Sequence, residues 1–140
     1  MGKGPFCFLF CAALLLSVLP AGCGKPEYKD GVYTGRSGED DTGAWGEVTI
    51  TIAGGIAGCQ FITRQKDGTV KDENYGKVNG EISSRDFYDK AQLAVRAMAQ
   101  YAKTYRETGD LGKVEAVSGA TIAFDQFNEA VEKALEKAKK

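Results

Sequence analysis

The sequence predicts an α+β fold, in which an antiparallel sheet is packed by a long helix and a C-terminal helix. Residues 47–53, EVTITIA, alternate apolar and polar side chains, which is typical of a half-buried strand. Gly54-Gly55 separates this run from a second strand-like run at 56–63, and paired glycines between such runs favour a hairpin turn. From Ser83 onward the apolar residues recur every three or four positions, which indicates helices.

The remaining segments of the first half are short. Residues 31–36 form a strand candidate, and residues 37–44, SGEDDTGA, consist of turn formers that predict a loop. Asp67-Gly68 offers a second turn, and the polar, glycine-containing stretch 71–81 is interpreted as loop.

The long helix begins near Ser83, where Ser83 and Asp86 fit a loose capping pattern, and ends near Gly109, which suits a C′ position. Residues 110–117 are expected to connect the long helix to the last helix, and residues 113–117 are a candidate for a short strand within this connection. The apolar stripe that predicts the buried face of the long helix comprises Phe87, Ala91, Ala94, Val95, Met98, Ala102 and Tyr105.

The last helix is expected to begin near Thr121 and to run to about Lys139. Two pairs, Glu129 with Lys133 and Glu136 with Lys140, have the i,i+4 spacing and orientation that support a helix. Its predicted buried stripe comprises Ile122, Phe127, Ala130, Val131, Ala134, Leu135 and Ala138.

Length, charge and residue types exclude several classes of function. A chain of 140 residues supports one compact domain. The net charge is −1 and no block of Lys or Arg stands out, so no nucleic-acid partner is expected. The chain has no His, which excludes Ser-His and Cys-His nucleophile pairs, His-ligated haem and most zinc sites.

The first 22 residues predict a secretory signal peptide. Lys3 precedes the apolar run PFCFLFCAALLLSVL, which is too short for a comfortable transmembrane helix of about 20 residues. The following PAGC resembles a bacterial lipobox in which Cys23 is lipidated. Residues 23–30 then form a lipid attachment and tether, and the chain is expected at the extracytoplasmic side of the cell membrane. The alternative is ordinary signal cleavage nearby, which leaves Cys23 free.

The four cysteines support this division of the chain. Cys7 and Cys11 lie in the predicted signal peptide, and Cys23 is the lipidation candidate. Only Cys59 remains, so one mature chain cannot form an internal disulfide, an iron–sulfur cluster or a zinc site ligated by cysteines. Cys59 falls in a strand pattern and is interpreted as a small core residue.

A short polar motif, Ser118-Gly119-Ala120-Thr121, leads directly into the last helix. A helix N-terminus has unpaired N–H groups and a partial positive charge, which favour a phosphate. Gly119 lets a ligand approach the backbone, and Thr121 places a hydroxyl at this site. The alternative is that Ser118 or Thr121 only caps the helix.

The motif and its surroundings resemble the FMN-binding domain family of bacterial extracytoplasmic redox proteins. The resemblance covers most of the mature chain, with residues 31–140 as the candidate FMN-binding domain, and is carried by YKDGVYTG (28–35), GAWGEVTITIAGGIAGCQFI (43–62) and VEAVSGATIAFDQFNEAVEKAL (114–135). It implies that a flavin transferase attaches FMN to Thr121 as a phosphodiester. The four-residue motif and Glu115, where the family usually has Asp, are then the cofactor-binding candidates.

The resemblance also implies a function. The chain is expected to be an exported, membrane-anchored flavoprotein that carries FMN covalently and exchanges electrons with a membrane redox donor or acceptor. It is a redox carrier more than a stand-alone enzyme, and no catalytic or metal-binding residue is predicted. The alternative is a lipid-anchored surface or ligand-binding module of the same fold without covalent flavin. Aromatic candidates for contact with the flavin ring are Tyr33, Trp45, Tyr75 and Phe124.

Overall fold

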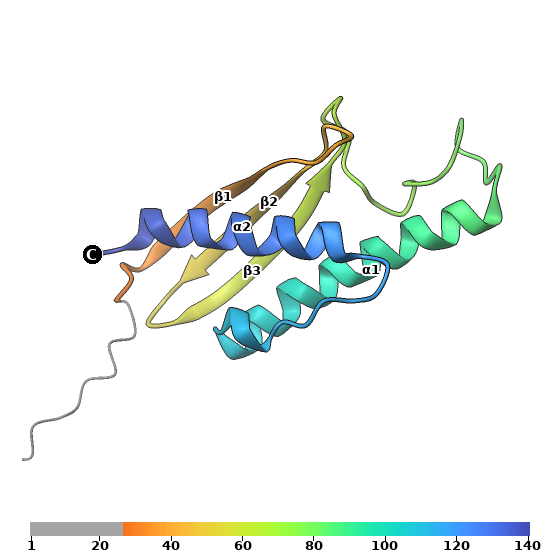
Figure 1. The fold of residues 1–140 in the computed structure, drawn as a ribbon. Helices are drawn as coiled ribbons and strands as arrows, with labels where there is room; N and C mark the ends of the chain where they lie inside the picture. Colours follow the sequence, from red (N-terminus) through yellow and green to blue (C-terminus); the bar gives the residue numbers. More distant parts are fainter. Residues whose placement is uncertain (1–26) are drawn as a thin grey trace, which may run out of the picture.

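The computed structural model describes residues 27–140 and confirms the α+β class. Three strands, β1 (Gly31–Glu39), β2 (Trp45–Ile52) and β3 (Ile56–Arg64), form an antiparallel sheet in the order β1-β2-β3. The helices α1 (Arg85–Thr108) and α2 (Thr121–Ala138) pack on this sheet, and a short 3₁₀ helix, η1 (Leu111–Lys113), lies between them. Figure 1 shows α2 crossing the sheet and α1 beside β3.

The core lies between the sheet and the two helices. On β2, Val48, Ile50 and Ile52 are buried while Thr49 and Thr51 are half-buried, as the alternation predicts. An aromatic cluster fills the space beneath the helices: the ring of Phe127 meets Phe61 edge to face at 5.0 Å and Tyr105 at 6.1 Å. Such aromatic pairs stabilise a core beyond their buried area.

Helix α2 approaches β1 unusually closely at Gly35. A Cβ atom at this position would lie 1.8 Å from the carbonyl oxygen of Ala130, so only glycine permits this packing. Two side chains of α2 also contact polar backbone groups of β1: Lys137 donates to Thr34 O at 2.6 Å, and Glu129 accepts from Gly38 N at 3.0 Å. The helix is thereby fixed along this strand.

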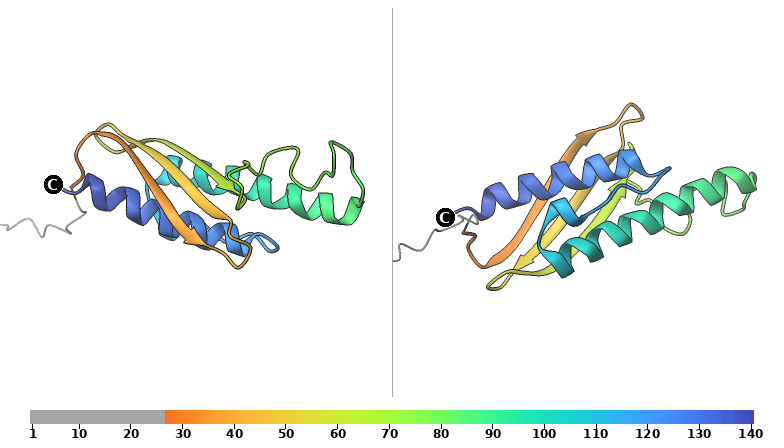
Figure 2. Two further views of the ribbon diagram at one scale, coloured as in Figure 1. Left: turned by 90° about the horizontal axis from the view of Figure 1, so that it is seen from above. Right: turned by 60° about the horizontal axis from the view of Figure 1, so that its bottom comes forward.

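The two ends of the described chain meet at the C-terminal end of α2. Tyr28 pairs with Lys139 in an isolated antiparallel bridge, and Lys29 N donates to Ala138 O at 2.8 Å. Lys140 forms an ion pair with Glu27 at 3.3 Å. The views in Figure 2 show residues near 30 beside this end of α2.

Several sequence predictions about local structure are confirmed. The hairpin turn follows Ile52, and the 65–69 turn contains Gly68. Gly109 ends α1 in the left-handed conformation with φ 65°. The Glu129–Lys133 ion pair forms at 2.6 Å.

Other boundaries differ from the prediction. Strand β1 continues to Glu39, because Glu39 pairs with Trp45 of β2 beyond an irregularity in the ladder at residues 37–38. Ser84 rather than Ser83 caps α1, accepting from Phe87 N at 3.4 Å. The short strand at 113–117 does not form: Lys113 belongs to η1, and residues 114–117 have no regular secondary structure. Lys140 pairs with Glu27 instead of Glu136.

Two residues of the predicted apolar stripes are exposed. Phe87 is 56% exposed and Ile122 is 60% exposed. Phe87 lies in the first turn of α1, before the first buried residue, Ala91, whereas Ile122 lies next to the buried Ala123 and off the buried stripe of α2. Helical periodicity therefore gives the buried face only approximately and does not show how far along the helix the packing extends.

Candidate functional site

The segment before α2 forms a tight turn that presents the Ser118–Thr121 motif. Ala120 N donates to Val117 O at 2.9 Å, and Gly119 at the third position has φ 86°. A hydrogen-bonded four-residue turn with a positive φ at this position is typical of type II, which favours glycine. A Cβ on Gly119 would also lie 2.8 Å from Leu93 Cδ2. Glycine is therefore required here by its dihedral angle and by space.

Tyr101 of α1 anchors this turn from beneath. Its side chain is 1% exposed, and its hydroxyl accepts from Val117 N at 2.9 Å and donates to Ala120 O at 3.3 Å. The ring packs edge to face against Phe124 at 5.5 Å. One hydroxyl thus joins the first and last residues of the turn, and α1 fixes the start of α2.

The interpretation of the hydroxyls as simple helix caps is wrong for this structure. The N-cap position is Ala120, and no side chain caps α2. The first bond of the helix runs from Phe124 N to Ala120 O at 3.1 Å. Ser118 and Thr121 are both exposed. Neither hydroxyl is engaged in capping, so the exposed Thr121 hydroxyl is free of that role.

A cavity of about 300 Å³ opens at the start of α2. Gly119, Ala120 and Thr121 line it, whereas Ser118 and the exposed Glu115 do not. Two buried polar side chains also line it: Gln126 is 6% exposed and Thr63 is 1% exposed. The structure therefore brings three of the five predicted site residues to one cavity.

The buried polar residues of this cavity are held by specific hydrogen bonds. Gln126 Nε2 donates to Ala44 O at 3.0 Å, which joins α2 to the β1–β2 turn. Thr63 Oγ1 donates to Met98 Sδ at 3.0 Å, which joins β3 to α1. A small ligand in this cavity would meet a fixed polar wall.

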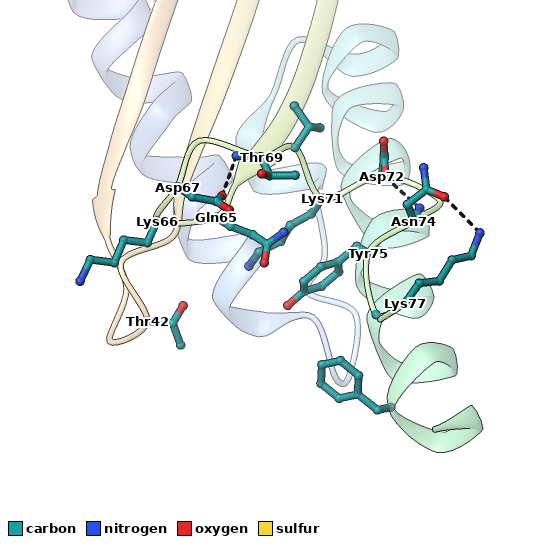
Figure 3. Close-up of a pocket in the computed structure, with 13 residues that line it drawn as sticks. Thr42, Gln65, Lys66, Asp67, Thr69, Lys71, Asp72, Asn74, Tyr75 and Lys77 are labelled. Carbon is teal, nitrogen blue, oxygen red and sulfur yellow. Dashed lines mark hydrogen bonds between the residues drawn. The ribbon is translucent and has the colours of Figure 1, made fainter. Parts of the chain in front are cut away.

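A larger cavity of about 830 Å³ adjoins the first one. It is lined by residues of the 65–77 segment and by Phe87 at the start of α1. Thr42, Lys71 and Tyr75 line both cavities, so the two lie side by side, and together they are called the groove. Figure 3 shows the Tyr75 ring projecting from the 71–81 segment toward Thr42 on the β1–β2 turn.

Charged groups gather where the two cavities join. Lys71 Nζ lies over the Tyr75 ring, 5.1 Å from its centroid. Partial burial opposes ionisation of Asp40, but hydrogen bonds from Thr42 and Ala44 and the charge of Lys71 together lower the pKa of that carboxyl. The Asp40 carboxylate thereby orders the β1–β2 turn, and Lys71 places a cation in the groove.

Of the four aromatic candidates, the structure places only Tyr75 among the residues that line the groove. Tyr33 of β1 donates its hydroxyl to the carbonyl oxygen of Lys29, which precedes the strand. Trp45 lies under the Arg36 guanidinium at 4.1 Å, and Phe124 packs against Tyr101.

Sequence reasoning missed Lys71, Thr42 and Gln126. Lys71 and Thr42 lie in segments interpreted only as loops, where no periodic pattern indicates which side chains face a cavity. Gln126 carried a usable signal: it falls on the buried face of α2 between Ala123 and Ala130, where a polar residue is out of place.

Among residues 27–140, no cluster of His, Cys, Asp and Glu has the arrangement of a metal site. Cys59 is buried, as the sequence predicts, and burial raises the pKa of its thiol to about 11. No helix in the described part of the chain is long and apolar enough to cross a membrane.

These features define a class of protein: a small α+β domain with a cofactor-sized groove at the start of its last helix. The family model of the FMN-binding domain matches residues 43–136, and the chain belongs to this family. No curated protein is detectably similar to the chain. A solved structure, the CPE2226 protein from Clostridium perfringens, is similar in fold, with 21% identity and a TM-score of 0.62. The similarity covers 80% of this chain and 89% of that one.

Membership in this family supports FMN as the cofactor, and the residues of the groove fit it. The two cavities lie within or near the usual range of about 300–1,000 Å³ for ligand sites. Thr121 and the N-terminus of α2 suit a phosphate, and Lys71 adds positive charge. Tyr75 supplies an aromatic surface. The domain is thus a flavin-binding module.

Proposed function

We propose that this chain is an exported, lipid-anchored flavoprotein that carries FMN covalently on Thr121 and acts as an electron-transfer module. The observation that supports the attachment is the position of Thr121. Its exposed side chain does not cap α2, yet it lines a cavity of an FMN-binding domain. A threonine without a structural task at such a position is available for modification.

The proposed attachment is carried out by a separate flavin transferase that uses FAD as donor. Thr121 Oγ forms a bond to the FMN phosphorus, the pyrophosphate bond of FAD breaks, AMP leaves and the hydroxyl proton is released. The resulting phosphodiester keeps one negative charge. That charge lies at the N-terminus of α2, where the helix dipole and free N–H groups stabilise anions.

The protein's own role is to hold and orient the cofactor. When bound, FMN supplies the redox chemistry, and the chain supplies position and electrostatics. Tyr101 and Gly119 fix the turn that carries Thr121, and Lys71 places positive charge beside the groove. A membrane redox donor or acceptor completes the proposed function, and lipid on Cys23 keeps the domain near it.

The test is the intact mass of the full-length protein produced in a host that has the transferase. Wild type should gain the mass of one phosphodiester-linked FMN and fluoresce on a denaturing gel. Thr121→Ala should lose both signals, and Thr121→Ser should retain attachment because it keeps a hydroxyl. Ser118→Ala is the matched control and should still be modified, since Ser118 lies outside the groove.

The Thr121→Ala protein should remain folded. The substitution removes no cap and lies at an exposed position, so its cost should be within about 0.5 kcal/mol. Circular dichroism checks this. Covalent FMN on Thr121→Ala would place the attachment site elsewhere and overturn the proposal.

A second candidate, a lipid-anchored module that binds FMN reversibly, is favoured by the size of the groove alone. It predicts a yellow native protein that loses all its flavin on denaturation. The denaturing gel therefore separates the two candidates directly.

A further inference from the structure

The two edges of the sheet differ in how the rest of the chain covers them. At the β1 edge, Lys137 of α2 reaches over the strand and donates to Thr34 O. At the β3 edge, pairing is confined to one end, where Lys71 N donates to Thr63 O at 2.8 Å. Proteins usually protect their edge strands, because unpaired N–H and C=O groups attract another strand. The remainder of the β3 edge is an exception to that rule.

The ladder between β2 and β3 determines which backbone groups of β3 are free. Its register is regular from Cys59 to Arg64, and in such a ladder the backbone groups of alternate residues point to opposite sides of the strand. Thr63 O points away from β2, so the N–H and C=O groups of Phe61 and Cys59 point the same way. Strand β3 is the last strand of the sheet (Figure 1), and within residues 27–140 no other backbone group pairs with them.

The sequence along this edge lacks the usual protection against pairing. Residues 56–62, IAGCQFI, contain no charged side chain and no proline, which are common means of keeping an edge strand from pairing. The same residues include isoleucine and phenylalanine, which favour strands. The composition of this edge therefore suits it to accept a further strand.

The position of α1 decides what kind of strand fits. Helix α2 packs mainly on β1 and β2, whereas α1 packs mainly on β3. Met98 contacts Thr63 and Gly109 lies beside Ile56, so α1 runs along the length of β3. A second copy paired through its own β3 would bring its own α1 to the same place. Paired strands lie about 4.8 Å apart, whereas packed helices need about 8–10 Å between their axes. A single extended segment has no such conflict.

A cation without an ion-pair partner lies beside the free edge. Arg106 of α1 is exposed and forms no ion pair within the described residues. Burial raises the pKa of the Cys59 thiol to about 11, and the positive charge of Arg106 opposes this rise, so the guanidinium lies near Cys59. Ala99 and Ala102 share this side of α1 by their helical spacing and present only methyl groups. This side of the helix suits a strand with small apolar side chains and one carboxylate.

We propose that the β3 edge at Cys59 and Phe61 receives an extended segment of another protein as a fourth, antiparallel strand, with a carboxylate of that segment paired to Arg106. Backbone hydrogen bonds supply the affinity, and the side chains that face α1 supply the selectivity. The chain's own residues 69–71 already pair with residues 63–65 in this orientation. Neither the groove nor the flavin takes part in this contact.

A synthetic peptide, acetyl-Thr-Val-Thr-Glu-Thr-amide, tests this binding by nuclear magnetic resonance with the full-length, isotope-labelled protein in detergent. Paired antiparallel to residues 58–62, its Val lies opposite Phe61 and its Glu opposite Cys59. Millimolar peptide should shift the amide signals of Cys59 and Phe61 and slow their hydrogen exchange several-fold, because each N–H gains an acceptor. The amide of Thr34, on the covered β1 edge, should not respond.

The role of Arg106 is tested with matched peptides and variants. Replacing the peptide's Glu by Gln should weaken binding about two- to fivefold. Arg106→Gln should weaken binding of the Glu peptide by a similar factor and leave the Gln peptide unaffected. Arg96→Gln is the control, because Arg96 is exposed on the same helix but lies toward the Thr63 end of the edge. Equal losses in the two variants would overturn the pairing assigned to Arg106.

Other outcomes would overturn the added strand itself. Unchanged signals of Cys59 and Phe61 in millimolar peptide, or changes confined to other parts of the sheet, would show that this edge does not accept a strand. Protection of these amides that increases with protein concentration, without peptide, would show that a second copy occupies the edge instead. Intact mass reports flavin attachment separately, so failure here and failure of the proposed function are distinguishable.

Discussion

Replacing Tyr101 by Phe should loosen the turn that carries the flavin attachment site. The change deletes only the hydroxyl that accepts from Val117 N at 2.9 Å and donates to Ala120 O at 3.3 Å. Ala120 O keeps its second partner, Phe124 N at 3.1 Å. The main loss is therefore one half-buried N–H left without its acceptor.

The expected magnitude follows from that single group. Leaving a buried donor unsatisfied costs about 1–3 kcal/mol, whereas the aromatic packing of the ring is retained. For a domain of this size, 1 kcal/mol corresponds to about 4 °C in Tm. Thermal unfolding should therefore shift down by about 4–12 °C. The fraction of chains modified at Thr121 should also fall, because the turn that presents the hydroxyl is less ordered.

Tyr105→Phe provides the matched control. Tyr105 lies one turn further along α1, is equally buried, and within residues 27–140 its hydroxyl donates to no carbonyl of the turn before α2. Deleting this hydroxyl should cost less than about 1 kcal/mol and leave flavin attachment unchanged. Equal shifts in Tm and in modification for the two variants would refute the role given to the Tyr101 hydroxyl.

Three further predictions concern other parts of the chain. Gly119→Val should lower the free energy of unfolding by about 1–3 kcal/mol and abolish flavin attachment, because Val disfavours φ 86° and crowds Leu93. Urea unfolding measures the first effect and intact mass the second, and normal attachment would contradict the prediction. Cys23→Ser should move the protein from the detergent phase to the aqueous phase, and a wild type found only in the aqueous phase would reject lipidation. The stability advantage of wild type over Cys59→Ala should shrink from pH 9 to pH 11. Burial raises the pKa of the Cys59 thiol in the folded protein from 9.0 to about 11, so the unfolded chain loses its thiol proton first as the pH rises. A difference in urea midpoint that stays constant over this range would count against the prediction.

The sheet and both helices could be predicted because their signals are local. The alternation in β2 and the three-to-four-residue spacing in α1 and α2 report which face each element buries. The same signals misplaced Phe87 and Ile122 in the core. Periodicity is a property of one helix, whereas burial of each side chain depends on what lies opposite it, and both of these side chains are exposed.

The attachment motif could be found from sequence, but the groove beside it could not. The motif is contiguous and ends at a helix start, so residue order identifies it. Lys71 and Tyr75 reach the same groove from a loop some 50 positions earlier, because the chain path returns this loop to the start of α2. The sequence makes Tyr75 only one of four aromatic candidates for contact with the flavin ring, and no sequence pattern distinguishes it from Trp45 or Phe124.

The bridge between Tyr28 and Lys139 fixes the start of the described chain to the C-terminal end of α2, and Thr121 lies at the other end of this helix. Helix α2 is therefore a rigid arm between the membrane-side end of the domain and the flavin attachment site. The arm spans 18 residues, so Thr121 stands about 27 Å from the point where residues 27–29 join the domain. That separation is close to the thickness of a bilayer's hydrocarbon core, about 30 Å. In the anchored form proposed above, residues 27–29 are fixed to the end of α2, so only residues 23–26 separate the lipid from the domain, and the flavin lies at the opposite end of this helix. A redox partner then exchanges electrons with the flavin either well above the membrane surface or, if the domain tilts, close to that surface. Lengthening the segment between the lipid and the domain should change which of these partners the flavin can reach.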